Sequence, residues 1–322
     1  MIFRAACKHA TGTYGGCLLS RLFRKELLSL LEQRGRTETM QLEVESSPRP
    51  YFFGDIGCWS ERTEVHKAAY LGEVTLLQRL IQNGASVNIV AVDSVTPLHE
   101  AAIRGQVECV RLLLDAGAQV DARNTDGSTP LCEACAAGSS DCVQLLLDRG
   151  AKVNPALTSR TTTPLMEACI SGNAECVKMV IAKGACLDTF DLYHGTPLHV
   201  ACSNTHVDCA KAILNAGAKV NAARFHDTAL HHAARRGHVE LLEMLVQFGA
   251  NLYARDKHNH LASHYTQPAT AAHACMLHYE SSPLSLMQQC RICVRRILGT
   301  RALKVLPQLD IPPRLINYLS YQ

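Results

Sequence analysis

Cysteine and histidine are the residues of this sequence whose chemistry first suggests a metal site or a nucleophile. The 322-residue chain holds 15 of each. The segments Cys132-x-x-Cys135 and Cys290-x-x-Cys293 each match half of a zinc site, but neither has a convincing second pair. His258, His260 and His264 do not share one helix face with a fourth ligand nearby. We therefore predict no metal and no cofactor, and interpret these three histidines as solvated loop residues.

Most of the cysteines follow a repeating register. Cys109, Cys142, Cys176 and Cys209 occupy one recurring position, and Cys135, Cys169 and Cys202 occupy another. Free cysteine in such positions behaves as a small buried hydrophobe. So many thiols without a disulfide framework predict a reducing compartment, the cytoplasm and also the nucleus. Because the sequence contains no Gly-rich phosphate loop, paired-metal motif or nucleophile elbow, we expect no catalytic residue and no enzyme.

Charge and hydropathy exclude two further classes of partner. The net charge is +3 and the charged residues are dispersed along the chain, which does not favour nucleic-acid binding. No uninterrupted apolar run approaches the length of about 18 residues that a membrane-spanning helix needs. We expect a protein that binds neither nucleic acid nor membrane.

The elements that position these residues repeat along the chain. The motif Thr-Pro-Leu-His begins at Thr96 and recurs, with substitutions, at Thr129, Thr163, Thr196 and Thr228, with a weaker copy at Thr63. A Gly-Ala pair keeps the same spacing at Gly84, Gly117, Gly150, Gly184, Gly217 and Gly249. A period near 33 residues with this motif resembles the ankyrin repeat. The predicted repeats are 63–95, 96–128, 129–162, 163–195, 196–227 and 228–260, with a partial copy at 261–266.

Each repeat has the features of two short helices and a finger-like turn. Thr96 can cap a helix with its hydroxyl group, and Pro97 suits the first helical position. Val107, Val110 and Leu113 indicate a second amphipathic helix that ends before the next Gly-Ala pair. One such unit cannot bury its own apolar faces, whereas stacked units can. The sequence therefore predicts an all-α repeat fold, an ankyrin solenoid of about six repeats over 63–266.

Both ends of the chain depart from this pattern. Residues 1–46 predict a disordered or variable extension, and 47–62 form an aromatic segment that includes Trp59. That segment is expected either to cap the first repeat or to contribute to a partner-binding surface. The composition of 267–283 predicts a linker, and 284–322 a small helical domain.

The C-terminal segment carries the most specific motifs. Leu286, Cys290 and Val294 recur at helical spacing after Ser285, which predicts an amphipathic helix that ends at Gly299. The pattern Ser-Leu-x-x-x-Cys-x-x-x-Val at 285–294 resembles the elongin-binding motif of a suppressor-of-cytokine-signalling (SOCS) box. The segment 309–312, Leu-Asp-Ile-Pro, resembles the motif with which such a box selects cullin-5, although Asp310 stands where that motif has its first proline.

Six ankyrin repeats followed by this box resemble the ankyrin repeat and SOCS box family over roughly residues 51–322. The resemblance implies that the box binds elongin C and elongin B through Leu286, Cys290 and Val294. It implies binding to cullin-5 with a RING protein through Leu309, Ile311 and Pro312. The ankyrin domain is then expected to capture an unknown substrate protein for ubiquitination.

The fingers at 188–194 and 222–227 differ from the small polar tips of the others. They carry Phe190, Tyr193, His194, Arg224, Phe225 and His226. Aromatic residues and arginine dominate binding hot spots, so we expect these residues, together with Trp59, to bind the substrate. The alternative is that Phe190 and Phe225, which lie 35 residues apart, stack on each other and stiffen adjacent fingers.

Two hypotheses of function stay open at this point. The first is a non-catalytic substrate receptor of a cullin–RING ubiquitin ligase. The alternative is an ankyrin protein-interaction scaffold with no ligase role, in which the C-terminal tail merely caps the solenoid. A simple cap does not need Leu286 and Cys290 together with the segment at 309–312, and this favours the receptor.

Overall fold

The structure is a computed structural model that describes residues 62–321 except 157–161, 192 and 283. The predicted extension 1–46 and the aromatic segment with Trp59 lie outside the described residues. The described residues belong to one compact unit that begins at Arg62.

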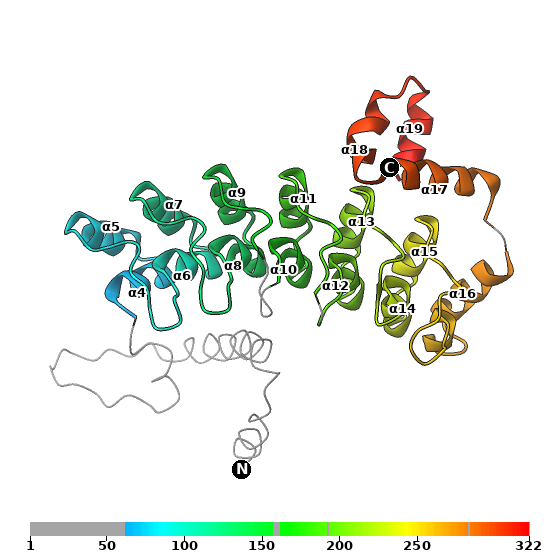
Figure 1. The fold of residues 1–322 in the computed structure, drawn as a ribbon, viewed down its shortest axis with the longest axis horizontal. Helices are drawn as coiled ribbons and strands as arrows, with labels where there is room; N and C mark the ends of the chain where they lie inside the picture. Colours follow the sequence, from blue (N-terminus) through cyan, green and yellow to red (C-terminus); the bar gives the residue numbers. More distant parts are fainter. Residues whose placement is uncertain (1–61, 157–161, 192, 283, 322) are drawn as a thin grey trace, which may run out of the picture. The chain divides into compact units, whose positions relative to one another are not determined.

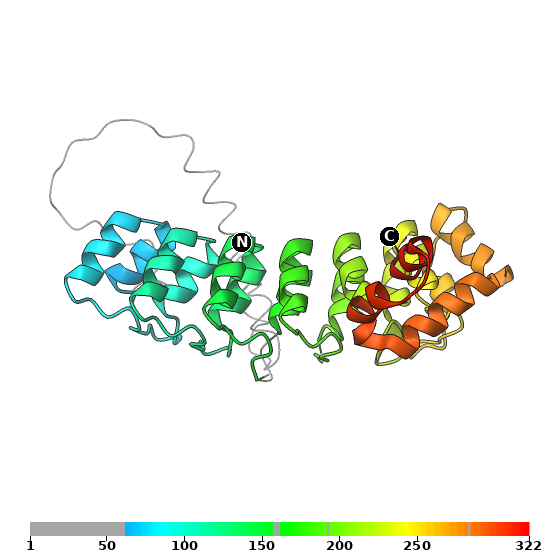
Figure 2. The ribbon, with the colours of Figure 1, turned by 90° about the horizontal axis from the view of Figure 1, so that it is seen from above.

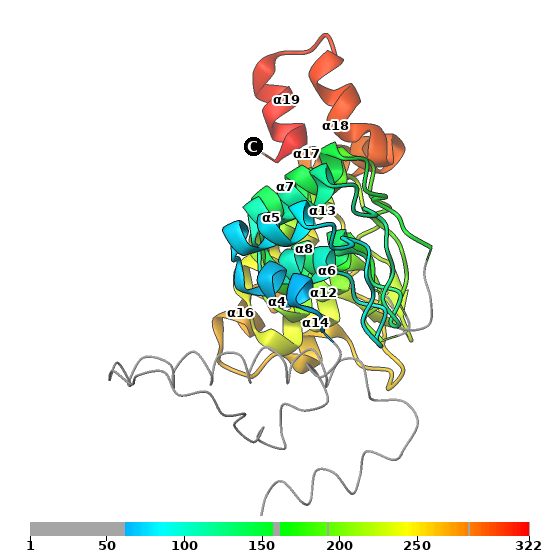
Figure 3. The ribbon, with the colours of Figure 1, turned by 90° about the vertical axis from the view of Figure 1, so that its left-hand side faces the viewer.

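Twelve helices of this unit form six pairs that stand side by side in a row (Figures 1 and 2). The first helix of each pair is α4 Glu64–Leu71, α6 Pro97–Ile103, α8 Pro130–Ala137, α10 Pro164–Ser171, α12 Pro197–Ser203 or α14 Ala229–Arg236. The second is α5 Val74–Gln82, α7 Val107–Asp115, α9 Ser140–Asp148, α11 Ala174–Ala182, α13 Val207–Asn215 or α15 Val239–Gln247. Viewed along the row, the loops between pairs gather on one side as fingers (Figure 3).

The recurring threonine and histidine begin the first helices and link the repeats. At Thr96 the N-cap N–H donates to Nδ1 of His99 at 3.2 Å, which closes a capping box. The same imidazole contacts the carbonyl oxygen of Ser128, in the next finger, through Nε2 at 3.1 Å. Because Nδ1 accepts a hydrogen bond here, the ring is neutral and Nε2 is the donor. Burial also lowers the pKa of His99, which keeps it uncharged.

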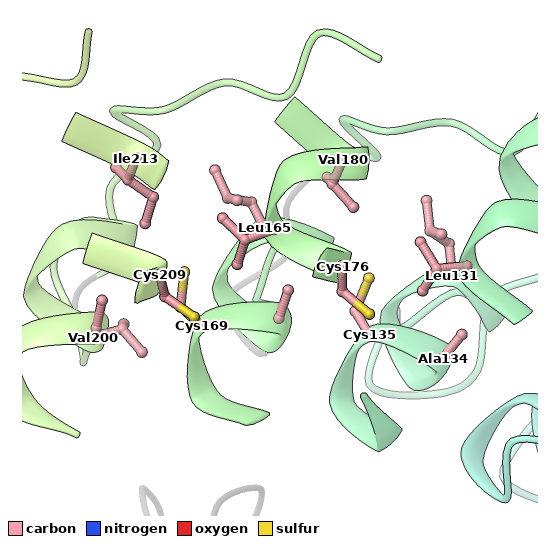
Figure 4. Packing of buried hydrophobic residues seen from close by; sticks show 14 of the residues in the cluster. Leu131, Ala134, Cys135, Leu165, Cys169, Cys176, Val180, Val200, Cys209 and Ile213 are labelled. Atoms are coloured by element: carbon pink, nitrogen blue, oxygen red, sulfur yellow. The ribbon is translucent and has the colours of Figure 1, made fainter. Parts of the chain in front are cut away.

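The apolar core runs through the whole row of repeats, and cysteines fill small positions in it. Figure 4 shows Cys135 beside Cys176 and Cys169 beside Cys209, each pair joining the first helix of one repeat to the second helix of the next. All four side chains are fully buried. Burial raises the pKa of such thiols, to about 12 for Cys202, so they are unreactive at neutral pH.

One finger forms a short β-hairpin. Strands β1 (Ala223–Arg224) and β2 (Asp227–Thr228) pair antiparallel, with Arg224 opposite Asp227. Two of the other fingers close with single bridges, Asp191 with Gly195 and Arg255 with Leu261. The hairpin therefore differs from these two fingers in having two pairs of residues in its ladder.

The chain after the sixth pair continues through a series of short helical elements. These are η1 Ala262–Tyr265, α16 Ala271–Ser281, α17 Leu286–Leu298, η2 Gly299–Arg301, α18 Ala302–Val305, η3 Leu306–Gln308 and α19 Pro313–Ser320. Helix α16 lies within the predicted linker 267–283, and its buried Ala272 and Met276 belong to the solenoid core. This part of the chain is therefore packed. Helix α17 lies against α13 and α15, and α18 and α19 extend from it away from the row (Figure 1). No helix among the described residues has both the length and the apolarity to cross a bilayer.

Candidate protein-binding surfaces

Helix α17 begins with a complete cap. The Ser285 hydroxyl accepts from the backbone N–H of Gln288, and the Ser285 N–H donates to the Gln288 side chain at 2.9 Å. This reciprocal cap fixes the first turn and therefore the direction of Leu286, the first helical residue. The helix ends at Gly299, as its position predicts.

The apolar face of α17 lies open to solvent. Leu286 is 76% exposed and Ile297 is 69% exposed, and Met287, Cys290 and Cys293 are also exposed. Val294 is half-buried. Soluble chains rarely leave such side chains together on one surface without a partner for them. The three residues expected to contact elongin therefore lie on one helix, and two of them are exposed.

The segment expected to contact a cullin forms the turn before α19. Leu309 and Ile311 are half-buried, whereas Asp310 and Pro312 are exposed, and Pro312 is the N-cap of α19. The Ile311 N–H donates to the Leu309 carbonyl at 2.9 Å, which makes the turn tight. Asp310 is therefore open to solvent at the position where the motif has a proline.

Two of the three arginines of α17, Arg291 and Arg295, are buried. Arg295 is 8% exposed and donates to the carbonyl oxygens of Leu214 at 3.0 Å and Asn215 at 2.7 Å, the last two residues of α13. A guanidinium group is favourable there because the C-terminal carbonyls of a helix lack intrahelical donors and carry partial negative charge. A third bond, at 3.0 Å, reaches the Leu319 carbonyl in α19. Arg295 thus joins α17 to α13 and α19.

Tyr321 completes this internal contact. Its ring stacks on Phe248 with centroids 3.6 Å apart, and the guanidinium carbon of Arg291 lies 3.8 Å from the Tyr321 ring centroid. The Tyr321 hydroxyl donates to the Gln247 carbonyl. Arg291 is 7% exposed. Sequence reasoning missed this role of Arg291 and Arg295, and their spacing of four residues is the signal that they share a face of the helix.

Two of the six repeated Gly-Ala positions also belong to this contact. A β-carbon at Gly217 would collide with the backbone of Gly299, and one at Gly249 would stand 2.8 Å from Cγ2 of Ile292. The equivalent positions Gly84, Gly117, Gly150 and Gly184 face open space. The glycine that follows the second helix in every repeat therefore has a second role in the last two, where it lets α17 and η2 approach closely.

The aromatic fingers present a second exposed surface. Phe190, Tyr193 and Phe225 are 44%, 50% and 62% exposed. The Arg224 guanidinium lies 5.4 Å from the Phe225 ring centroid. No ring contact joins Phe190 to Phe225 among the residues whose positions are described, which argues against the stacking alternative.

The two histidines of these fingers differ. His194 is half-buried and its Nδ1 lies 3.2 Å from the Asp191 carboxylate, whereas His226 is exposed at the hairpin tip. Elsewhere His258, His260 and His264 are exposed. In the described part of the chain no group of three or more histidine, cysteine or acidic side chains has the geometry of a metal site.

Comparison with known families and proteins agrees with this architecture. Models of ankyrin repeats match residues 65–156, 154–224 and 225–257, and the SOCS box model matches residues 282–320. Ankyrin repeat and SOCS box protein 13 of Mus musculus and that of Homo sapiens are both 60% identical to this chain over 270 residues, which cover 84% of this chain and 96% of theirs.

A solved structure extends the comparison to three dimensions. The crystal structure of the human ASB11 ankyrin repeat domain superposes with a TM-score of 0.65 at 38% identity, and covers 69% of this chain and 100% of that one. The ankyrin repeat domain of Bcl-3 superposes with a TM-score of 0.56 at 28% identity, and covers 67% of this chain and 98% of that one. This chain matches the ankyrin repeat and SOCS box models and is 60% identical to ankyrin repeat and SOCS box protein 13 over most of its length. It therefore belongs to the ankyrin repeat and SOCS box family.

Proposed function

We propose that this chain is the substrate-recognition subunit of an elongin B/C–cullin–RING ubiquitin ligase. The observation that carries the proposal is the exposed apolar face of α17, in a segment that matches the SOCS box. The chain itself is non-catalytic, and ubiquitin transfer belongs to partner subunits. Its many free thiols fit a cytoplasmic or nuclear site of action.

The box binds elongin C by inserting Leu286 and Cys290 into an apolar pocket, with Val294 at the edge, and elongin B binds with elongin C. Burying a leucine side chain contributes roughly 1.5–3 kcal/mol. The double variant Leu286→Ala with Cys290→Ala should therefore abolish co-purification of elongins B and C. Arg296→Ala is the matched control, because this exposed residue is on the same helix but not on the apolar stripe. Wild-type recovery of the elongins by the double variant would favour the scaffold without a ligase role.

Cullin-5 with its RING protein is recruited in part by the turn at Leu309, Ile311 and Pro312. The exposure of Pro312 supports this role, and Asp310 makes the contribution weak. Replacing all three residues with alanine should reduce cullin binding and leave the elongins attached. Loss of both partners together would indicate instead that the box had unfolded.

The ankyrin domain captures the substrate through the aromatic fingers, by Phe190, Tyr193, His194, Arg224, Phe225 and His226. The exposure of the three aromatic rings supports this assignment, whereas the contribution of Trp59 stays a prediction outside the described residues. The double variant Leu286→Ala with Cys290→Ala should accumulate bound substrate, because without elongin binding the substrate is no longer degraded. Changing Tyr193, Arg224 and Phe225 to alanine should release that substrate at an unchanged melting temperature, and an unchanged substrate profile would exclude these fingers.

A further inference from the structure

The β1–β2 hairpin lies close to the elements on both sides of it. Arg224 packs against the preceding finger, where a β-carbon at Gly195 would stand 3.2 Å from its Cβ. In helix α14, which follows the hairpin, the Arg235 guanidinium donates to the Asp227 carboxylate at 2.9 Å and lies 3.8 Å from the Asp256 carboxylate of the following finger. We call this the basic finger surface and define it by Arg224, Phe225, His226, Arg235, Arg255 and Lys257.

The acidic and basic side chains of this surface differ in their exposure to solvent. Three carboxylates of these fingers are largely buried: the side chains of Asp191, Asp227 and Asp256 are 13%, 20% and 1% exposed, whereas Asp188 is 29% exposed and pairs with Lys219. Asp191 and Asp256 accept backbone N–H groups of their own fingers. Arg255 and Lys257 are exposed, whereas Arg235 is one-third exposed and already paired with Asp227. What a partner meets is therefore positive, although the fingers contain acids.

The hairpin tip carries backbone strain that the fold does not require. A two-residue turn of this kind needs a positive φ at both central residues, and Asn-Gly is the usual solution. Here the two residues are Phe225 with φ 47° and His226 with φ 72°. Among their described residues, the neighbouring fingers place one residue each in this region, Gly195 and Asn259. A bulky side chain held there costs roughly 1–2 kcal/mol and indicates a use outside the fold.

We propose that the basic finger surface binds an acidic segment of the substrate that also carries an aromatic or long apolar side chain. The inference rests on the proposed receptor function, which makes the occupant a protein segment. Carboxylates of that segment meet Arg224, Arg255 and Lys257, and the apolar side chain packs on Phe225, which Arg224 already flanks. The outward cations and the open aromatic ring fit such a segment better than a basic or purely apolar one.

The test uses the purified full chain and a displayed library of random linear peptides as the probe. Selected peptides should be more acidic than the input library and enriched in aromatic or long apolar residues. The selected peptides are then synthesised with a fluorophore and their affinity for the chain is measured. Arg224→Glu in the chain should lower this affinity by about 10–100-fold, since removing one partner of a close charge pair costs one or two factors of ten in affinity. Arg123→Glu, an exposed arginine on an earlier finger, is the matched control and should bind normally.

A second variant separates binding from folding. Phe225→Asn with His226→Gly installs the favoured turn and removes the exposed ring. Its melting temperature should be unchanged or higher by about 2–4 °C, while peptide binding falls by the same factor as in the charge reversal. A protein that becomes more stable as it loses binding is the expected signature. If this variant melts lower, the charge reversal still decides the proposal.

Several outcomes overturn the inference. Selection of neutral or basic peptides, selection of none, or acidic peptides that bind Arg224→Glu normally would each do so. So would a labelled single-stranded oligonucleotide that binds as tightly as the acidic peptides and displaces them. Elongin capture, measured on the same preparations, reports separately on the proposed receptor function, so the two failures can be told apart.

Discussion

Helices α15 and α17 lie next to each other but distribute their side chains in opposite ways. Helix α15 buries Leu241, Leu242, Leu245 and Val246 and exposes Glu240 and Glu243, as a surface helix of a folded domain does. Helix α17 buries Arg291 and Arg295 and exposes Leu286, Met287 and Ile297.

The difference separates the contacts that this chain completes from those it leaves open. The apolar face of α15 is covered by neighbouring helices, so its packing is complete. Arg291 and Arg295 of α17 contact carbonyl groups and aromatic rings of neighbouring elements, so this face of α17 is also covered. Of these faces, only the apolar one of α17 is left uncovered by the described residues, and we infer that a second protein covers it. The two faces should then respond to different substitutions.

The largest effect on docking is expected from Arg295→Ala. The substitution removes the side-chain donor of the Asn215 carbonyl, whereas the Leu214 carbonyl keeps the Gly217 N–H, and a buried group left unsatisfied costs about 1–3 kcal/mol. Amide hydrogen exchange in α17 to α19 should rise, while the solenoid and elongin binding stay intact.

Arg296→Ala provides the control for this experiment, because Arg296 is on the same helix but exposed. It should leave hydrogen exchange unchanged. If Arg295→Ala instead abolished elongin capture without loosening α17, the assignment of one face to the solenoid and the other to elongin would be wrong.

A smaller effect should distinguish Gly217→Ala from Gly117→Ala. Both glycines have positive φ, so both substitutions carry roughly 1–2 kcal/mol of backbone strain. Only at Gly217 does the added methyl group also meet the backbone of Gly299. Thermal unfolding should show both variants destabilised, but proteolysis between α16 and α17 should accelerate only in Gly217→Ala. Equal proteolysis of the two variants would contradict the close approach.

The smallest effect is a dependence on pH that is confined to the solenoid. Burial lowers the pKa of His99, His199 and His231 below the ordinary value of 6.5, and lowers that of His232 to about 4. Because the unfolded chain then binds more protons, this stability is present above pH 6.5 and is lost as the pH falls toward 4. The melting temperature should fall over that range.

The box offers an internal reference for this prediction, since residues 284–322 contain no histidine. A melting temperature that did not change between pH 6.5 and 4 would show that the buried histidines do not titrate as inferred.

The repeat fold could be predicted because its signals are local and recur. The threonine N-caps recur in all six copies with the period of the solenoid, and the prolines after four of them and the cysteine positions keep the same period. The apolar stripe of α17 was likewise visible from spacing alone. The cysteine register also pointed correctly to burial of the seven repeat thiols.

The docking of the box could not be predicted, because it depends on contacts between distant residues. Arg295 meets Asn215, 80 positions away, and nothing near either residue marks the pair. Gly217 and Gly249 look the same in sequence as the four glycines that face open space. The strain at Phe225 was also hidden, since only the paired strands show that its turn has two residues.

The central claim is that the apolar face of α17 is covered by elongin C, and the chain contains its own reporters. Cys290 and Cys293 are exposed on α17, and Cys186 is exposed on a finger far from that helix in sequence. Maleimide labelling of the free chain, read by mass spectrometry, should modify all three. After saturation with elongins B and C, labelling of Cys290 should be suppressed while Cys186 reacts as before. Equal labelling of Cys290 and Cys186 in the elongin-saturated sample would contradict the account.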